Sequence, residues 1–128
     1  MMSQPQALII DDNAKNVSIL AHLLSAEGLE SIQVINPATL DAKLQSASHI
    51  RVVFLDLELP NVDGYQVLHK LKNDARFHNI PIVAYTVHVS EIQVAHQQGF
   101  DGFLAKPLDS DKFPGQLSRI LKGEPVWE

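Results

Sequence analysis

The chain contains no cysteine, which excludes disulfide bonds, thiolate metal sites and thiol nucleophiles. It also lacks long apolar runs. None approaches the roughly 20 residues that a bilayer-spanning helix needs, and residues 1–7 lack the basic and apolar regions of a secretion signal. Positive charge is sparse, because the net charge is −5 and Lys and Arg form no cluster. These absences predict a cytoplasmic protein with protein partners and no direct contact with membranes or nucleic acids.

The length of 128 residues, 45% of them hydrophobic, suits a single globular domain. We predict that residues 1–122 form this domain and that residues 123–128 are a loose, flexible tail. The length leaves no room for a separate output domain. We therefore expect the protein to act through protein contacts, or else to be one domain of a larger protein.

Short apolar runs alternate with helical patterns five times along the chain. The runs that predict strands cover residues 7–10, 32–35, 52–55, 80–85 and 102–105. Repeated strand–helix units form a parallel sheet with helices on both faces, and five units are too few for an eight-stranded barrel. The predicted fold class is therefore α/β, a (βα)5 doubly wound five-stranded parallel sheet of flavodoxin-like order 2-1-3-4-5.

The predicted strand at residues 52–55 ends abruptly at Asp56. Pro60 and the turn-forming residues 61–64 then take the chain away from the sheet. All strands of such a sheet end at the same edge, where ligands bind in open α/β folds. The polar residues that follow the first, third, fourth and fifth strands should therefore converge: Asp11, Asp12, Asp56, Thr86 and Lys106.

This residue set predicts phosphoryl chemistry. Carboxylates within a few ångströms repel one another, so a cation must compensate. Oxygen donors without His or Cys favour a hard divalent ion such as Mg²⁺, or Mn²⁺, which commonly also binds a phosphate oxygen. Asp56 could then attack phosphorus to form an aspartyl phosphate, with Lys106 as a countercharge and Thr86 as a hydroxyl donor.

Each of these residues alone has a simpler interpretation. Asp11 or Asp12 could be a helix N-cap, Thr86 a strand-end hydroxyl and Lys106 a solvated surface charge. Phe103, taken alone, would be a core residue. The placement of all the polar residues at strand ends favours a functional site over these separate roles.

With these motifs in place, the chain resembles the receiver domains of bacterial response regulators, from about Ala7 to Leu121. The segments that carry the resemblance are Asp11-Asp12-Asn13, Asp56-Leu57-Glu58-Leu59-Pro60, Asp63-Gly64, Thr86 and Asp101-Gly102-Phe103-Leu104-Ala105-Lys106-Pro107. The resemblance is to single-domain receivers of the chemotaxis-regulator kind in two-component phosphorelay signalling.

The resemblance implies roles for individual residues. Asp56 would accept a phosphoryl group from a histidine kinase or a histidine phosphotransfer protein. Asp11, Asp12, Asp56 and the backbone carbonyl of Glu58 would hold Mg²⁺. Thr86, Phe103 and Lys106 would form a switch that alters the face of the fourth helix, fifth strand and fifth helix, where a downstream protein would bind. The Lys106–Pro107 peptide bond would be cis.

Several positions depart from the usual receiver pattern. Val87 stands where receivers usually have a small residue, and its side chain could slow access to Asp56. Glu58 and His88 occupy positions that tune the lifetime of the phosphoryl group in this family. Phe103 replaces a more frequent tyrosine, so the aromatic switch residue lacks a hydroxyl.

Two other functions stay open at this point. The first is a degenerate receiver that serves as a constitutive protein-interaction scaffold, which Val87 favours and the full Asp, Thr and Lys set disfavours. The second is an unrelated flavodoxin-like hydrolase, although no water-activating base is evident. We expect a signalling domain, not an enzyme, that catalyses only its own phosphotransfer and autodephosphorylation.

Overall fold

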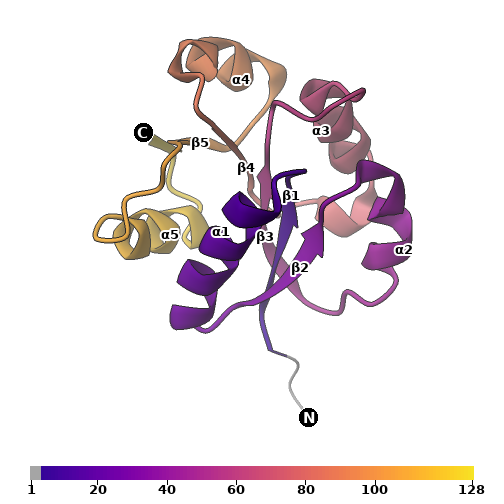
Figure 1. Cartoon of the computed structure of the whole chain (residues 1–128), viewed down its shortest axis with the longest axis horizontal. Helices are drawn as coiled ribbons and strands as arrows, with labels where there is room; N and C mark the ends of the chain where they lie inside the picture. The colour runs from indigo at the N-terminus through magenta and orange to yellow at the C-terminus, as the bar shows by residue number, and fades with distance from the viewer. Residues whose placement is uncertain (1–3) are drawn as a thin grey trace.

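The computed structural model describes residues 4–128 and shows a single parallel sheet in the strand order β2-β1-β3-β4-β5-β6 (Figure 1). Every neighbouring pair of strands is parallel. The predicted order 2-1-3-4-5 is thus confirmed, with one strand added at the β5 edge. The strands are β1 (Gln6–Ile10), β2 (Glu30–Val34), β3 (Ile50–Leu55), β4 (Ile82–Thr86), β5 (Gly102–Ala105) and β6 (Val126–Trp127).

Within the described residues, five α-helices cover the two faces of the sheet. They are α1 (Ala14–Ala26), α2 (Leu40–Leu44), α3 (Gly64–Lys72), α4 (Ile92–Gln98) and α5 (Phe113–Leu121), with short 3-10 turns at Pro37–Thr39, Ala75–Phe77 and Val89–Glu91. Helices α1 and α5 pack into one hydrophobic cluster, and α2, α3 and α4 into the other. The molecule therefore has three layers, as the doubly wound prediction requires.

The two clusters arise from the alternation of side chains along the strands. In β3, Val53 and Leu55 point to the side of α2, α3 and α4, whereas Val52 and Phe54 point to the side of α1 and α5. All four are fully buried. Because helices cover both faces, a strand of this sheet reads as an unbroken apolar run.

The end of the chain differs from the prediction. Residues 123–128 were expected to be a loose tail, but Val126 and Trp127 form β6, which pairs with Gly102 and Phe103 of β5. The sheet therefore has six strands instead of five. Val126 is buried against the α5 side, which supplies the apolar contact that holds so short a strand.

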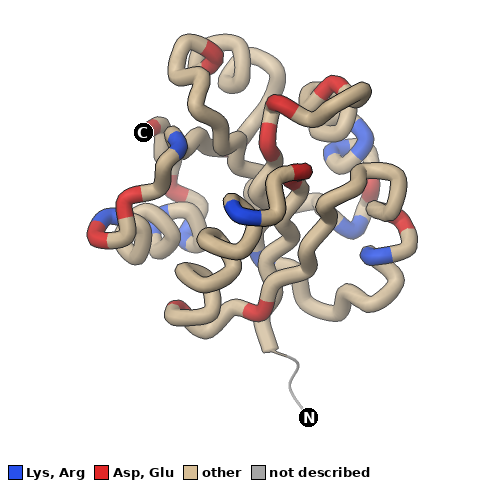
Figure 2. The backbone as a smooth tube through the Cα atoms, in the orientation of Figure 1, with Lys and Arg blue, Asp and Glu red and all other residues tan. Residues whose placement is uncertain are grey.

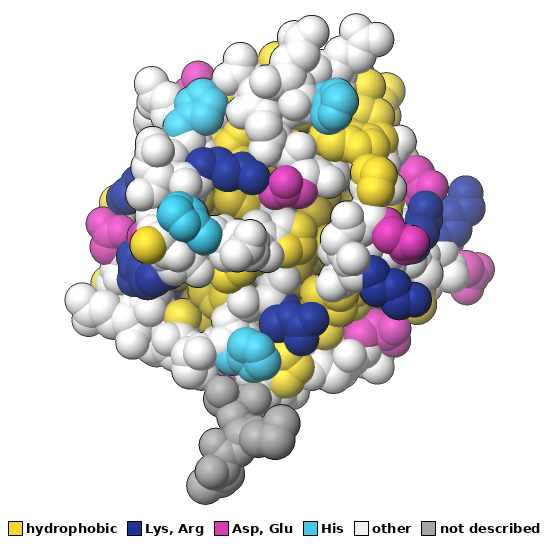
Figure 3. Space-filling model, turned by 180° about the vertical axis from the view of Figure 1, so that it is seen from behind, with side chains coloured by type: hydrophobic (Ala, Val, Ile, Leu, Met, Phe, Trp, Pro, Cys, Tyr) yellow, Lys and Arg dark blue, Asp and Glu magenta, His cyan; other side chains and the backbone are white. Residues whose placement is uncertain are grey.

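Lys, Arg, Asp and Glu lie mostly on the loops and on helices α1, α2, α3 and α5, whereas strands β1, β4, β5 and β6 and helix α4 carry none (Figure 2). Seen from behind, hydrophobic side chains reach the surface between charged ones, and the visible histidines lie apart from one another (Figure 3). Within residues 4–128, no helix combines the length and apolarity that a membrane span requires.

Candidate functional site at the C-terminal edge of the sheet

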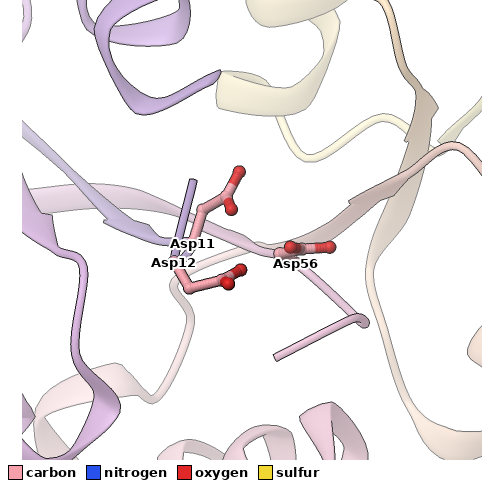
Figure 4. Close-up of side chains that lie close together, drawn as sticks. All are labelled: Asp11, Asp12 and Asp56. Carbon is pink, nitrogen blue, oxygen red and sulfur yellow. The ribbon is translucent and has the colours of Figure 1, made fainter. Parts of the chain in front are cut away.

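The C-terminal ends of β1 and β3 place three carboxylates together (Figure 4). One oxygen from each of Asp11, Asp12 and Asp56 lies within 4.8 Å of the others. Asp11 and Asp56 are 0% and 4% exposed, whereas Asp12 is exposed to solvent. The pairing of β1 with β3 explains why the carboxylates lie together. The Asp56 amide donates a hydrogen bond to the carbonyl of Ile10 (2.9 Å), the last residue of β1. This confirms that these carboxylates converge.

Helix capping does not account for the aspartates. The N-cap of α1 is Asn13, whose side chain accepts a hydrogen bond from the Asn16 amide (3.1 Å). The Asn13 amide itself donates to Asp11 Oδ1 (2.9 Å), which orients that carboxylate. The N-cap interpretation of Asp11 and Asp12 is therefore wrong, because Asn13 holds the N-cap position.

Lys106, one residue beyond β5, reaches into the carboxylate cluster. Its Nζ lies 3.0 Å from Asp11 Oδ2 and 3.5 Å from Asp56 Oδ1, and its side chain is only 10% exposed. The surface-charge interpretation of Lys106 is therefore wrong. One ammonium cannot neutralise three carboxylates, so the cluster keeps an excess of negative charge.

Tyr85, the fourth residue of β4, is a member of this site that sequence reasoning missed. Its buried hydroxyl donates to Asp11 Oδ2, and Nζ of Lys106 lies 4.1 Å from the centre of its ring. These contacts hold both charged side chains in place. Burial and the neighbouring Asp11 raise the pKa of the Tyr85 hydroxyl, so it remains a hydrogen-bond donor. The only sequence signal was a polar atom at the end of an otherwise apolar strand.

The environment of Asp56 changes its acidity. Burial raises the pKa of the Asp56 carboxyl from 3.8 to about 6, and the nearby charge of Asp11 adds to the rise. The hydrogen bond from the Glu58 amide (3.1 Å) and the charge of Lys106 act in the opposite direction. Asp56 is therefore mostly ionised at neutral pH, although burial makes its ionised form less stable than it would be in water. A bound cation would offset this loss of stability.

Thr86, the last residue of β4, is fully buried at the same edge and bonds to Glu58. Its hydroxyl donates to Glu58 Oε1 (3.0 Å), and the same oxygen lies 2.7 Å from Nε2 of His88. The His88 amide in turn donates to the Thr86 hydroxyl (3.3 Å). Glu58, Thr86 and His88 thus form one small network, which we call the Glu58 latch. The network engages the Thr86 hydroxyl both as a donor and as an acceptor.

The remaining candidates lie around this edge. Phe103 is fully buried among the residues that pack under α3 and α4. Val87 is 55% exposed on the loop after β4. The Lys106–Pro107 peptide bond is cis, as the resemblance implied. Gly64 begins α3 beside the site, where a Cβ would lie 3.1 Å from the carbonyl oxygen of Asp56, so this glycine permits a close approach of the two segments.

The donor set suits a hard divalent cation. All three converging ligand groups are carboxylates, and among residues 4–128 they form the only cluster of three or more acidic, His or Cys side chains with this spacing. Two of the three are buried, and burial with the neighbouring charge of Asp11 raises the pKa of the Asp56 carboxyl, so a cation beside Asp56 would stabilise its ionised form. Asp11, Asp12 and Asp56 therefore fit Mg²⁺ or Mn²⁺, which prefer oxygen ligands.

Comparison with known proteins identifies the family. Residues 7–117 match the family model of the response regulator receiver domain. The chain belongs to this family. It is therefore the receiver domain of a response-regulator signalling system, with the flavodoxin-like fold of that family and a signalling role.

Known proteins similar to this receiver domain vary in size. The hybrid signal transduction histidine kinase L of Dictyostelium discoideum is 33% identical over 91% of this chain, which spans only 7% of that kinase. The polar-differentiation response regulator DivK of Brucella ovis is 28% identical, with 89% of this chain and 94% of DivK covered. The receiver therefore matches both a module of a long protein and a protein of about its own length.

A solved structure shares the fold. The receiver domain of sensor histidine kinase PA1611 from Pseudomonas aeruginosa superposes with a TM-score of 0.78 at 21% identity, covering 94% of this chain and 99% of that one. That structure has a magnesium ion coordinated in its active site cleft.

Proposed function

We propose that Asp56 is the phosphoacceptor of this receiver domain and takes a phosphoryl group from a phosphohistidine donor. The observation that carries the proposal is the position of the Asp56 carboxylate. It is buried at the end of a central strand, within one cluster with Asp11 and Asp12, and its Oδ1 lies 3.5 Å from the Lys106 ammonium. No observation favours the alternative of a scaffold without a phosphoacceptor.

The transfer would follow from the chemistry of these groups. An Asp56 carboxylate oxygen attacks phosphorus, the new O–P bond forms as the P–N bond to the donor imidazole breaks, and the electron pair of that bond stays on the imidazole. Lys106 would neutralise the charge on a phosphoryl oxygen. Asp11, Asp12, Asp56 and the backbone carbonyl of Glu58 would hold Mg²⁺, which supplies Lewis-acid stabilisation of the phosphoryl oxygens when bound.

The Glu58 latch would set the conformational response. A phosphoryl group on Asp56 offers strong acceptor oxygens to the Thr86 hydroxyl, which would have to leave Glu58 Oε1 to reach them. Phe103 is already buried, so the switch would act by repacking at the ends of β4 and β5. The change would reach the face of α4, β5 and α5, where a downstream protein would bind. Hydrolysis of the aspartyl phosphate by the same site would return the receiver to its first state.

The partners that the family implies are a histidine kinase or a histidine phosphotransfer protein. The names of two relatives, a hybrid histidine kinase and a sensor kinase/phosphatase, support this assignment. Asp12 is exposed to solvent beside the buried Asp56, which supports access of a donor protein to this edge of the sheet.

The test is the intact mass after incubation with a small phosphodonor such as acetyl phosphate. One phosphoryl adduct should form with Mg²⁺ and not with EDTA. Asp56→Asn should abolish the adduct, whereas Asp111→Asn, at an exposed position outside the carboxylate cluster, should leave it unchanged. A full adduct on Asp56→Asn would refute the assignment.

A further inference from the structure

Tyr85 of β4 contacts an aspartate and the lysine of the site through different parts of its side chain. Its hydroxyl donates to Asp11 Oδ2, and the Lys106 ammonium lies over its ring, 4.1 Å from the ring centre. Nζ of Lys106 also lies 3.0 Å from the same oxygen of Asp11. Each of these three side chains therefore contacts the other two.

The packing of Tyr85 does not require its hydroxyl. The side chain is 1% exposed, and its ring meets the Phe54 ring edge to face, with 6.4 Å between the ring centres. A phenylalanine at this position would fill the same space and would bury no polar atom. The hydroxyl places a hydrogen-bond donor inside the core, and the group that it meets there is the Asp11 carboxylate. Its effect must therefore act on Asp11.

Protein donors use most of the acceptor capacity of Asp11. Its Oδ1 accepts from the Asn13 amide (2.9 Å), and its Oδ2 accepts from both Tyr85 and Lys106. A carboxylate has about four acceptor sites, so these three bonds leave one, on Oδ1. Asp11 can offer Oδ2 to a cation only if one of the two donors moves away. The Tyr85 hydroxyl thus competes with a cation for this carboxylate.

The hydroxyl also compensates part of the charge of Asp11. A hydrogen bond to an ionised carboxylate stabilises the charged form, and it does so more strongly in a buried site than in water. Asp11 is 0% exposed, and one of its oxygens lies within 4.8 Å of oxygens of Asp12 and Asp56. Without the hydroxyl, the repulsion among these carboxylates would be less compensated, and a cation beside them would stabilise the cluster more. Competition and compensation therefore act in the same direction.

We propose that Tyr85 is a positioning residue that limits the affinity of this receiver for a divalent cation. Its hydroxyl holds Asp11 paired with Lys106, so the site binds the ion more weakly than the same carboxylates would without it. Loading of the site then depends on the concentration of the ion. This inference rests on the part of the proposed function that places Mg²⁺ at Asp11, Asp12 and Asp56. It does not require that Asp56 accept a phosphoryl group.

The test compares Mg²⁺ affinities, measured by titration of backbone amide chemical shifts without phosphodonor. Tyr85→Phe keeps the ring beside Lys106 and removes only the hydroxyl. Mg²⁺ should then bind about fivefold more tightly, which is part of the net free energy of one hydrogen bond to a charged group. Tyr65→Phe is the matched control, because the Tyr65 hydroxyl also donates to a carboxylate, that of Glu91 (2.6 Å), which lies outside the cluster. The control should leave the affinity unchanged.

Two further measurements separate this role from a general loosening of the core. The melting temperature of Tyr85→Phe in EDTA should fall while its Mg²⁺ affinity rises, because a buried hydrogen bond is lost. A purely structural role would lower both. In an Asp11→Asn background, Tyr85→Phe should change the affinity by less than about twofold, because the hydroxyl acts through the charge of Asp11. Circular dichroism checks that each variant is folded.

An Mg²⁺ affinity of Tyr85→Phe equal to or below that of the parent would overturn the proposal, as would the same gain in the Asp11→Asn background. The absence of Mg²⁺ binding by both the parent and Tyr85→Phe would also overturn it. Since no phosphodonor is present, these outcomes are independent of whether Asp56 is the phosphoacceptor, which the intact-mass experiment decides.

Discussion

Replacing Asp56 by Asn should stabilise the metal-free receiver at neutral pH, although it removes the proposed phosphoacceptor. Asn has nearly the shape of Asp and no charge. The substitution therefore removes an ionised group from a buried position where it faces Asp11. The loss of the 3.5 Å contact with Lys106 opposes this gain, but it is the smaller effect, because the pKa of Asp56 is raised even with Lys106 present.

The size of the effect follows from the acidity of Asp56. Its pKa rises from 3.8 to about 6 on folding, and each pKa unit corresponds to about 1.4 kcal/mol, which gives roughly 3 kcal/mol. Between these two pH values the folded protein binds more protons than the unfolded chain, so the free energy of unfolding falls as the pH rises. The free energy of unfolding of Asp56→Asn should therefore equal that of the parent below pH 4 and exceed it by roughly 3 kcal/mol above pH 6.

The assay is urea unfolding of the parent and Asp56→Asn between pH 4 and pH 7.5, with EDTA. Asp111→Asn is the control, and a surface change of this kind should stay within about 0.5 kcal/mol at every pH. Adding Mg²⁺ should reduce the difference in free energy of unfolding between variant and parent at neutral pH. The reason is that the ion stabilises the parent more than a variant with one ligand fewer. A variant that is less stable than the parent at pH 7, or a difference that does not change with pH, would refute the reasoning.

Three further predictions concern the same edge of the sheet. Asp12→Ala should lower Mg²⁺ affinity by about tenfold or more in a calorimetric titration, with an unchanged or higher melting temperature in EDTA, since a like charge is removed; unchanged affinity would contradict the ligand assignment. Glu58→Ala should free the Thr86 hydroxyl and tighten binding of the phosphoryl mimic beryllofluoride roughly fivefold. This follows because the half-exposed hydrogen bond to the charged Glu58 contributes about 1 kcal/mol. Weaker or equal binding would show that the Glu58 latch does not restrain Thr86. Val87→Ala should raise the rates of both phosphorylation and dephosphorylation with little change in Mg²⁺ affinity, and rates equal to the parent's would show that the loop holds this side chain clear of Asp56.

The site could be predicted from the sequence because strand ends carry their own signal. An apolar run followed at once by a polar residue marks the end of a buried strand, as at Leu55 and Asp56. Because the strands are parallel, such ends lie at the same edge of the sheet. Their convergence can therefore be predicted without knowing any side-chain contact. Asp11, Asp56 and Lys106 were found in this way, and their convergence is confirmed.

The contacts within the site could not be predicted in the same way. Tyr85 belongs to an apolar strand, and its hydroxyl meets Asp11 only because β4 and β1 end at the same level. The bond from Thr86 to Glu58 depends on the path of the loop after β3, which no periodicity encodes. Strand β6 was missed because two residues cannot show an alternating pattern, and Val126 and Trp127 form a strand only where the edge of β5 receives them.

The most direct measurement of the central claim is to locate the covalent bond. Borohydride reduces an aspartyl phosphate to homoserine, so the receiver is incubated with acetyl phosphate and Mg²⁺, reduced and sequenced by tandem mass spectrometry. The account predicts homoserine at position 56 alone, in a yield that falls to background with EDTA. Homoserine at position 11 or 12, or a phosphoryl group that stays on a histidine with residue 56 unmodified, would contradict it.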